Sequence, residues 1–248
     1  MKNNRKRYLI LNITLISLLI LFVLSFVRAE IFNSRIDDLL IEFKESAILD
    51  LEKSNDKFKY YKVSRETKEN RSAFYDEESL IPGNPGDIIV DLESPFYIPI
   101  LKELQTHYTG GHALFSYGDK ILEITGNIFR TDNKVQYLEN DYITNDDLDY
   151  FVGLRVKNMS EEDYKKLDNY LTNQIGKKYN YTFFFNRKNT FYCTDLVSRA
   201  YESIKSEYDL NPTKGFVTVQ DLVLSKDTYI FMIKEKNNSG GFNIYYLE

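Results

Sequence analysis

Residues 111–123 read GHALFSYGDKILE, and this stretch decides how the rest of the chain is interpreted. Residues 112–117 and 120–125 are rich in apolar, aromatic and β-branched side chains, which predicts two short strands. Gly118 and Asp119 between them suit a two-residue hairpin turn with glycine at the first central position. The stretch therefore predicts an antiparallel hairpin.

The turn also fixes which side chains share a face of this hairpin. If Tyr117 pairs with Lys120, His112 and Glu123 become diagonal neighbours, with backbones roughly 7–8 Å apart. A glutamate side chain can cross that gap, orient the imidazole and stabilise its charged form. A register slip of one residue would place the two side chains on opposite faces, leaving a structural histidine and an exposed strand charge. His107 lies in a polar stretch and is expected in a loop.

Cys193 is the only cysteine, and it stands where a helix over residues 193–206 is expected to begin. A thiol at a helix N-terminus is close to the positive end of the helix dipole, which favours the thiolate. The backbone N–H groups there can stabilise an oxyanion. The alternative is that Cys193 is a small buried apolar residue. Asp195 is expected to support the helix N-terminus and not to act as a catalytic acid.

The remaining pattern favours an α+β fold, because strands and helices are partly segregated along the chain. A capping box at Ser160 and Asp163 and a stop signal at Gly176 define one helix. The expected strands are 87–92, 151–157, 228–233 and 242–247, and the expected helices are 160–175, 193–206 and 217–224.

The N-terminus carries a membrane signal. Residues 1–7 form a basic tail, expected in the cytoplasm, and residues 8–27 form an uncharged, mostly apolar run that is long enough to span a bilayer as a signal anchor. A cleaved signal peptide is the alternative, with cleavage after Ala29, and the protein would then be secreted. Either reading exports the body. Residues 28–81 are expected to form a helical stalk followed by a polar linker, and the helix of the stalk is expected over residues 31–53. The catalytic domain is expected over residues 82–248, after the boundary marked by prolines and glycines.

Composition excludes several classes of function. The net charge is −5, and four of the basic residues lie in the first seven positions, so the body is more acidic still. An acidic body disfavours nucleic acid as a partner. One cysteine and two histidines cannot build a structural zinc site of the usual kind, and the sequence has no Gly-rich phosphate loop. No metal or cofactor is expected.

Five stretches together resemble the permuted NlpC-type cysteine hydrolases, called YiiX-like, of the papain-like superfamily. They are residues 85–90 (PGDIIV), 111–115 (GHALF), 121–123, 176–180 (GKKYN) and 191–197 (FYCTDLV). Histidine precedes glutamate and cysteine here, the order that a circular permutation of the papain-like fold would give. The likeness covers about residues 86–201.

This resemblance implies that Cys193 is the nucleophile, His112 the general base and then acid, and Glu123 the residue that orients the imidazole. It also implies that Tyr179 lies near the nucleophile as an oxyanion or substrate contact. The implied activity is hydrolysis of an amide bond in cell-wall peptide. Two alternatives stay open: a lipid acyl hydrolase or acyltransferase on the same fold, acting on a lipid amide or ester, and an inactive membrane-anchored binding module.

Overall fold

The computed structural model describes residues 2–64, 71–94, 98–126, 131–183, 185, 188–212 and 215–248, and within them the fold is a mixture of helices and strands. The helices are α1 (Lys2–Lys44), α2 (Pro99–Thr109), α3 (Glu161–Thr172), α4 (Cys193–Ile204) and α5 (Val219–Val223). The main strands are β1 (Ala47–Asp50), β2 (Phe58–Val63), β5 (Ile88–Asp91), β6 (His112–Ser116), β7 (Lys120–Glu123), β8 (Gln136–Glu139), β9 (Tyr150–Val156), β12 (Thr228–Lys236) and β13 (Phe242–Leu247). Two short pairs complete the fold: β3 (Phe74–Asp76) with β4 (Ile81–Pro82), and β10 (Lys178–Tyr179) with β11 (Thr190–Phe191).

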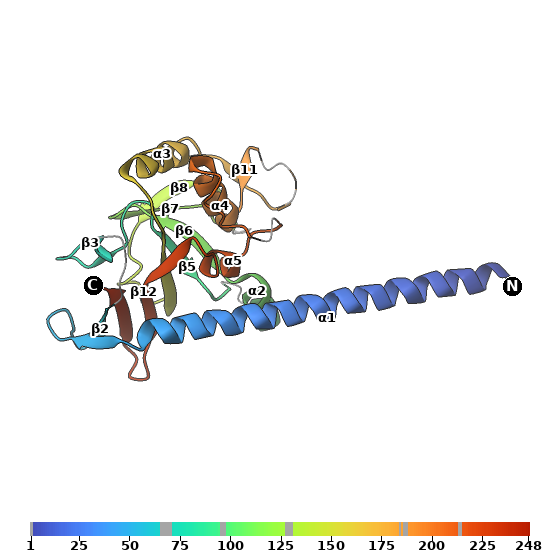
Figure 1. Cartoon of the computed structure of the whole chain (residues 1–248), viewed down its shortest axis with the longest axis horizontal. Coiled ribbons are helices and arrows are strands. Elements are labelled where there is room, and N and C mark those ends of the chain that lie inside the picture. Colours follow the sequence, from blue (N-terminus) through green and yellow to red (C-terminus); the bar gives the residue numbers. More distant parts are fainter. Residues whose placement is uncertain are drawn as a thin grey trace.

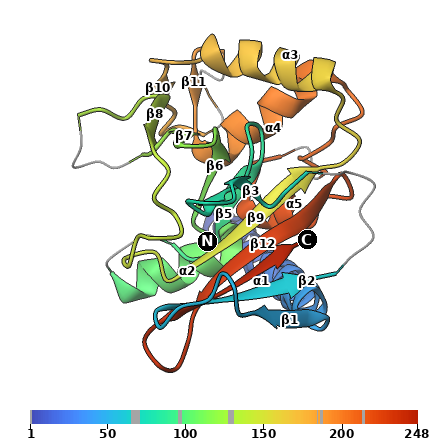
Figure 2. The same ribbon diagram turned by 90° about the vertical axis from the view of Figure 1, so that its left-hand side faces the viewer.

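The main strands form one sheet in the order β1-β2-β13-β12-β9-β5-β6-β7-β8. Neighbouring strands are antiparallel except β2 and β13, which run parallel. Helix α4 packs on β6 and beside α3, whereas α5 packs on β12. Helices α3 and α4 thus lie together, away from α1 and α2 (Figures 1 and 2).

The sequence predicted most of these elements. The α+β class and the expected strands and helices after residue 86 are confirmed, with shifts of a few residues at their ends. The capping box at Ser160 is present, with the Asp163 backbone N–H donating to the serine hydroxyl at 3.2 Å.

Two expectations about the first half of the chain are wrong. The helix expected to reach residue 53 ends at Lys44, and residues 47–50 form an edge strand instead. Residues 58–63, expected in a stalk and linker, pair with the C-terminal strand β13. The sheet therefore includes residues before the expected boundary at 82, and part of that linker, residues 65–70, lies outside the described residues.

His107 was expected in a loop but lies in the last turn of α2, a helix that the sequence did not predict. The imidazole stacks on the Phe26 ring of α1, with ring centroids 4.9 Å apart. The helix is amphipathic, but none of its residues is buried, so its apolar residues do not pack in the core as those of the other helices do.

Helix α1 is long and apolar enough to cross a membrane, and its apolar part is exposed. It projects well beyond the rest of the chain in Figure 1, with the N-terminus at its far end. The same helix continues without a break into the domain, where Ile36, Leu40 and Phe43 are buried in the core. An anchor of this kind would be joined to the domain by continuous helix instead of a flexible linker.

Candidate active site

The β6–β7 hairpin has the register that the sequence predicted. Phe115 pairs with Leu122, and the Tyr117 backbone N–H donates to the Lys120 carbonyl at 2.8 Å. Gly118 has a φ of +76°, a conformation that residues with a Cβ rarely adopt, which explains glycine at the first turn position. The turn residue therefore sets the pairing, and the pairing sets which side chains face one another.

His112 and Glu123 meet as this register requires. The distance between His112 Nε2 and Glu123 Oε2 is 2.9 Å. The side chains are 20% and 8% exposed respectively, so little water competes for the contact. A carboxylate in this position fixes the orientation of the imidazole and favours its protonated form.

Cys193 lies next to His112, although 80 residues separate the two in sequence. Cys193 is half-buried and is the first residue of α4, whose N-cap is Tyr192. Its sulfur hydrogen-bonds with the His112 side chain and accepts from the backbone N–H groups of Ala113 and Thr194. The structure therefore brings the expected cysteine, histidine and glutamate into one contiguous chain of contacts.

The electrostatics of these residues favour an ion pair. Burial disfavours the thiolate, but the hydrogen bond and charge of His112, with the backbone N–H donors, outweigh it and lower the Cys193 pKa. Burial likewise disfavours the imidazolium, but the contacts with Cys193 and Glu123 raise the His112 pKa to about 10. A lowered thiol pKa and a raised imidazole pKa both favour the thiolate–imidazolium pair over the neutral thiol and imidazole.

Contacts on both sides of Cys193 hold the start of α4 in place. The Thr194 hydroxyl donates to the Val217 carbonyl at 2.7 Å, and the Val217 backbone N–H donates to the Tyr192 hydroxyl at 3.0 Å. Further along the helix, the Tyr201 hydroxyl donates to the Gly86 carbonyl. Asp195 is fully buried and contacts Arg199 at 3.1 Å, one turn later in the helix, while its role at the helix N-terminus stays a prediction.

Gly111 is required for the position of His112. Its backbone N–H donates to the Asp91 carbonyl at 3.0 Å. A Cβ at residue 111 would lie 1.8 Å from the carbonyl oxygen of Glu93, closer than any two such atoms can approach. Because Gly111 immediately precedes the histidine, a side chain here would displace the start of β6.

The sequence analysis did not identify two residues that lie near the site. Asp91 pairs directly with His112 across β5 and β6, and burial raises the pKa of its carboxyl to about 6. Tyr142 is buried and has a pKa raised well above its ordinary value by burial and by the negative charges of Glu123 and Asp91. The only sequence signal for Asp91 was its place at the end of an apolar strand. The 20 residues between β5 and β6 do not determine the register of the two strands, so the sequence could not show that Asp91 lies opposite His112.

Tyr179 lies close enough to Cys193 for the thiolate to add to the effect of burial in raising the phenol pKa. It belongs to β10, which runs parallel to β11 just before the nucleophile helix. A Cβ at Gly126 would lie 2.4 Å from the Tyr179 ring, so this glycine leaves room for the ring. The Cys193 charge thus acts on Tyr179, and the role of this tyrosine as an oxyanion or substrate contact stays a prediction.

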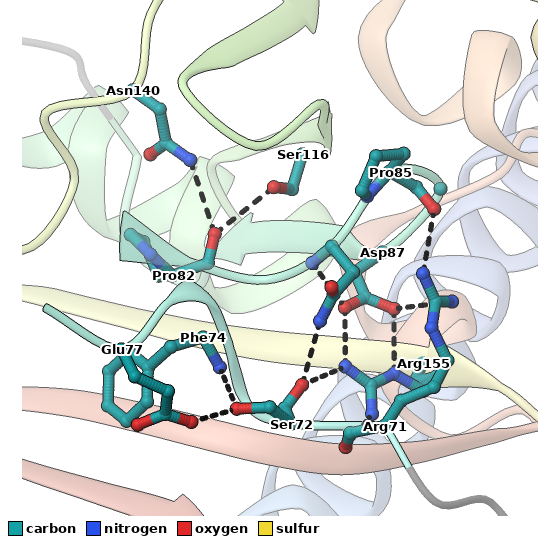
Figure 3. A network of polar contacts seen from close by, with 12 residues as sticks. Arg71, Ser72, Phe74, Glu77, Pro82, Pro85, Asp87, Ser116, Asn140 and Arg155 are labelled. Atoms are coloured by element: carbon teal, nitrogen blue, oxygen red, sulfur yellow. Dashed lines mark hydrogen bonds and ion pairs between the residues drawn. The ribbon is translucent and has the colours of Figure 1, made fainter. Parts of the chain in front are cut away.

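The aspartate of the PGDIIV stretch has a structural partner. Fully buried Asp87 forms a bidentate ion pair with Arg155, with Nε–Oδ1 and Nη2–Oδ2 distances of 2.8 and 2.7 Å. Arg155 also donates to the carbonyls of Arg71 and Ser72 at 2.8 and 2.9 Å (Figure 3). This network attaches the segment just before β3 to β9 and to the residue that precedes β5.

Comparisons with known proteins add a single structural likeness. No family model matches the chain, and no curated protein matches it. The fold resembles the crystal structure of the metalloprotein YiiX from Escherichia coli O157:H7, with 20% identity and a TM-score of 0.44. The match covers 59% of this chain and 95% of that one. Among the residues described here, no group of three or more His, Cys, Asp or Glu side chains is suited to a metal ion. The YiiX-like resemblance noted in the sequence and the wider papain-like relationship both stay predictions.

Proposed function

We propose that the chain is an extracytoplasmic cysteine hydrolase that cleaves an amide bond, on a circularly permuted papain-like domain. The observation that carries this proposal is the continuous contact from Glu123 through His112 to Cys193 at the start of α4. Three groups of these types in this order are what nucleophilic acyl transfer requires: an activated nucleophile, its proton acceptor and a residue that orients the acceptor.

The reaction would begin from the thiolate–imidazolium pair. The Cys193 sulfur attacks the carbonyl carbon, and the carbonyl oxygen takes up negative charge beside the N–H groups at the start of α4. His112 gives its proton to the leaving amine, and the C–N bond breaks to leave a thioester on Cys193. His112 then takes a proton from water, the resulting hydroxide displaces the thiolate, and the acid product leaves.

The location proposed for this chemistry follows from α1. The helix is suited to crossing a membrane, and the basic tail before it favours a cytoplasmic N-terminus. The domain would then face the outside of the cell. An amide in cell-wall peptide is a substrate that such a location makes accessible, and it is the substrate that the family resemblance suggests.

A lipid ester or amide is a second candidate substrate, favoured by the surroundings of α1. A hollow of about 500 Å³ is lined by Leu21 and Leu24 of α1 and by Phe216. The Phe216 ring stacks on Tyr192, with centroids 4.8 Å apart, and Tyr192 immediately precedes Cys193. A partly apolar hollow beside the anchor is therefore bounded by Phe216, which packs on the residue before the nucleophile, and an acyl chain would enter there.

Trapping the thioester tests the proposal and separates the two substrates. The full chain in phospholipid vesicles is incubated with wall-derived peptides, quenched with acid and examined by intact-mass and peptide mass spectrometry. A peptidyl adduct on Cys193 supports the amide hydrolase, and a fatty acyl adduct supports the lipid hydrolase. Cys193→Ala should abolish either adduct, and Glu139→Gln, an exposed carboxylate on β8, should leave it unchanged. Hydrolysis that continues in Cys193→Ala would contradict the proposal, and absence of adduct and product with an unreactive thiol would favour the binding module.

A further inference from the structure

Helix α2 exposes an apolar face that no part of the described chain covers. Ile98, just before the helix, is 58% exposed, and Ile100, Leu101 and Leu104 within it are 70%, 43% and 48% exposed. At 100° per residue, Ile100, Leu101 and Leu104 fall within one third of the helix circumference. Lys102 lies on the opposite side and forms an ion pair with Glu93 at 2.7 Å. The helix is therefore amphipathic with its apolar side outward.

This face lies beside the apolar part of α1. The Asn33 side-chain amide donates to the His107 carbonyl at 3.1 Å, and the His107 ring stacks on Phe26. Phe22 and Phe26 of α1 line a hollow of about 790 Å³ together with Ile100 and Leu104 of α2. The charged side chains of Glu93, Lys102 and Glu103 also line this hollow. The other side of α2 is attached to the domain, where the Gln220 side-chain amide donates to the Thr106 carbonyl at 3.2 Å. Figure 1 shows α2 alongside α1, at the edge of the domain from which α1 projects.

The position along α1 sets the depth of α2. The apolar run ends at Val27, five residues beyond Phe22. At about 1.5 Å per residue, Phe22 then lies ~7.5 Å inside the end of the run. Amphipathic helices that lie in a membrane interface bury their apolar side about 5–10 Å into the headgroup and acyl boundary. Whatever surrounds Phe22 and Phe26 must also meet Ile100 and Leu104, and for a membrane-spanning α1 this is lipid.

We propose that α2 is an interfacial helix whose Ile98, Ile100, Leu101 and Leu104 side chains insert into the outer leaflet beside α1. The domain then rests on the membrane through two elements. The inference rests on α1 crossing the membrane and does not depend on the hydrolase chemistry. Because Gly110 and Gly111 alone separate α2 from His112, this contact would hold the start of β6 near the membrane surface.

The absence of tryptophan from the chain provides a direct test. Single-tryptophan variants of the full chain are reconstituted into phosphatidylcholine vesicles with and without brominated acyl chains, which quench tryptophan on contact. Leu104→Trp reports on the apolar face of α2, and Lys102→Trp reports on its charged side, beside Glu93. Leu19→Trp reports on the span itself. Tyr75→Trp is the water-exposed control, because Tyr75 is 51% exposed and packs at Gly118, at the far end of β6 from α2.

The proposal predicts that Leu104→Trp and Leu19→Trp emit at shorter wavelength than Tyr75→Trp and lose most of their fluorescence in brominated vesicles. Lys102→Trp should lose several-fold less, and Tyr75→Trp almost none. Quenching of Leu19→Trp without quenching of Leu104→Trp would overturn the proposal. So would a blue-shifted Leu104→Trp that brominated lipid does not quench, which would indicate a second copy of the chain on this face. Failure to quench Leu19→Trp would overturn it as well, since α1 would then not span.

Discussion

Replacing Glu123 by glutamine should lower the pKa of His112 while leaving the shape of the hairpin intact. The substitution keeps the size of the side chain and its ability to accept a hydrogen bond, but it removes the negative charge 2.9 Å from the imidazole. The charge is sheltered, because Glu123 is 8% exposed and His112 20% exposed. We therefore expect an electrostatic effect with little structural change.

The expected magnitude follows from the two anions that share His112. Contacts with the Cys193 thiolate and the Glu123 carboxylate together overcome burial and raise the His112 pKa from 6.5 to about 10. An opposite charge within about 4–6 Å shifts a pKa by about 1–3 units. Glu123→Gln removes one of the two charges, so the His112 pKa should fall by about 1–3 units, which is about 1.4–4 kcal/mol of charge interaction.

The chain has only two histidines, which makes NMR a practical assay. The full chain with ¹³C-labelled histidine in detergent micelles gives two ring signals, and His107→Ala assigns them. Each signal is followed from pH 5 to 11 in the parent, in Glu123→Gln and in the control Glu139→Gln. The control removes a carboxylate from the adjacent strand β8 without touching the imidazole.

The reasoning would be refuted by a His112 pKa that is the same in Glu123→Gln as in the parent. It would also be refuted by a parent His112 that titrates near its ordinary value of about 6.5, since neither anion would then be acting on it. An equal fall of the His112 pKa in Glu139→Gln would show that the effect comes from the total charge of the sheet and not from the contact with Glu123.

Three further predictions concern the surroundings of the site. Gly111→Ala should destabilise the fold by about 1–3 kcal/mol and slow alkylation of Cys193, because the alanine Cβ would meet the Glu93 carbonyl. Thermal unfolding measures the stability and thiol labelling measures the alkylation rate. A Tm and an alkylation rate equal to those of the parent would contradict the close approach of Gly111 to Glu93. Arg155→Met removes the bidentate partner of the buried Asp87 carboxylate, which then keeps Arg71 at 3.8 Å and the Asn84 backbone N–H at 2.8 Å. The substitution should cost up to about 3–5 kcal/mol and lower Tm by up to about 6–20 °C, and a shift below about 2 °C would show that the ion pair contributes little. Asp163 has a pKa lowered from 3.8 to about 2 because hydrogen bonds from its lysine and serine partners outweigh burial, so its contribution to stability is full above pH 4 and lost as the pH falls towards 2. The difference in unfolding free energy between the parent and Asp163→Asn should shrink over that range, and a constant difference would show that the shift is absent.

Local sequence signals predicted the contact between His112 and Glu123, because a two-residue turn determines the register of the strands that it joins. The start of α4 at Cys193 was predicted for a similar reason, since apolar residues at helical spacing begin there. These signals act over a few residues, so no knowledge of the rest of the chain was needed.

The parts that were missed depend on distant residues. Strand β2 has its partner in β13, more than 180 residues later, and no local pattern in residues 58–63 reveals that pairing. Asp91 reaches His112 through a strand pair joined by a long connection. Helix α2 has no buried residue, so it lacks the row of core-facing apolar residues by which helices are recognised. Its apolar residues face outward beside α1. Long-range pairing and outward-facing apolar residues are what single-sequence patterns represent least well.

The most direct test of the proposed active site is the rate of Cys193 alkylation as a function of pH, because every thiol signal in this protein comes from that residue. The full chain in detergent is compared with His112→Ala and with His107→Ala, which removes the other histidine. We predict that the parent and His107→Ala react rapidly well below pH ~8.5, the value of an ordinary thiol, and that His112→Ala requires a pH near it. Slow alkylation of all three proteins, with one shared pH profile near the ordinary thiol value, would contradict the Cys193–His112 pair and the hydrolase proposed from it.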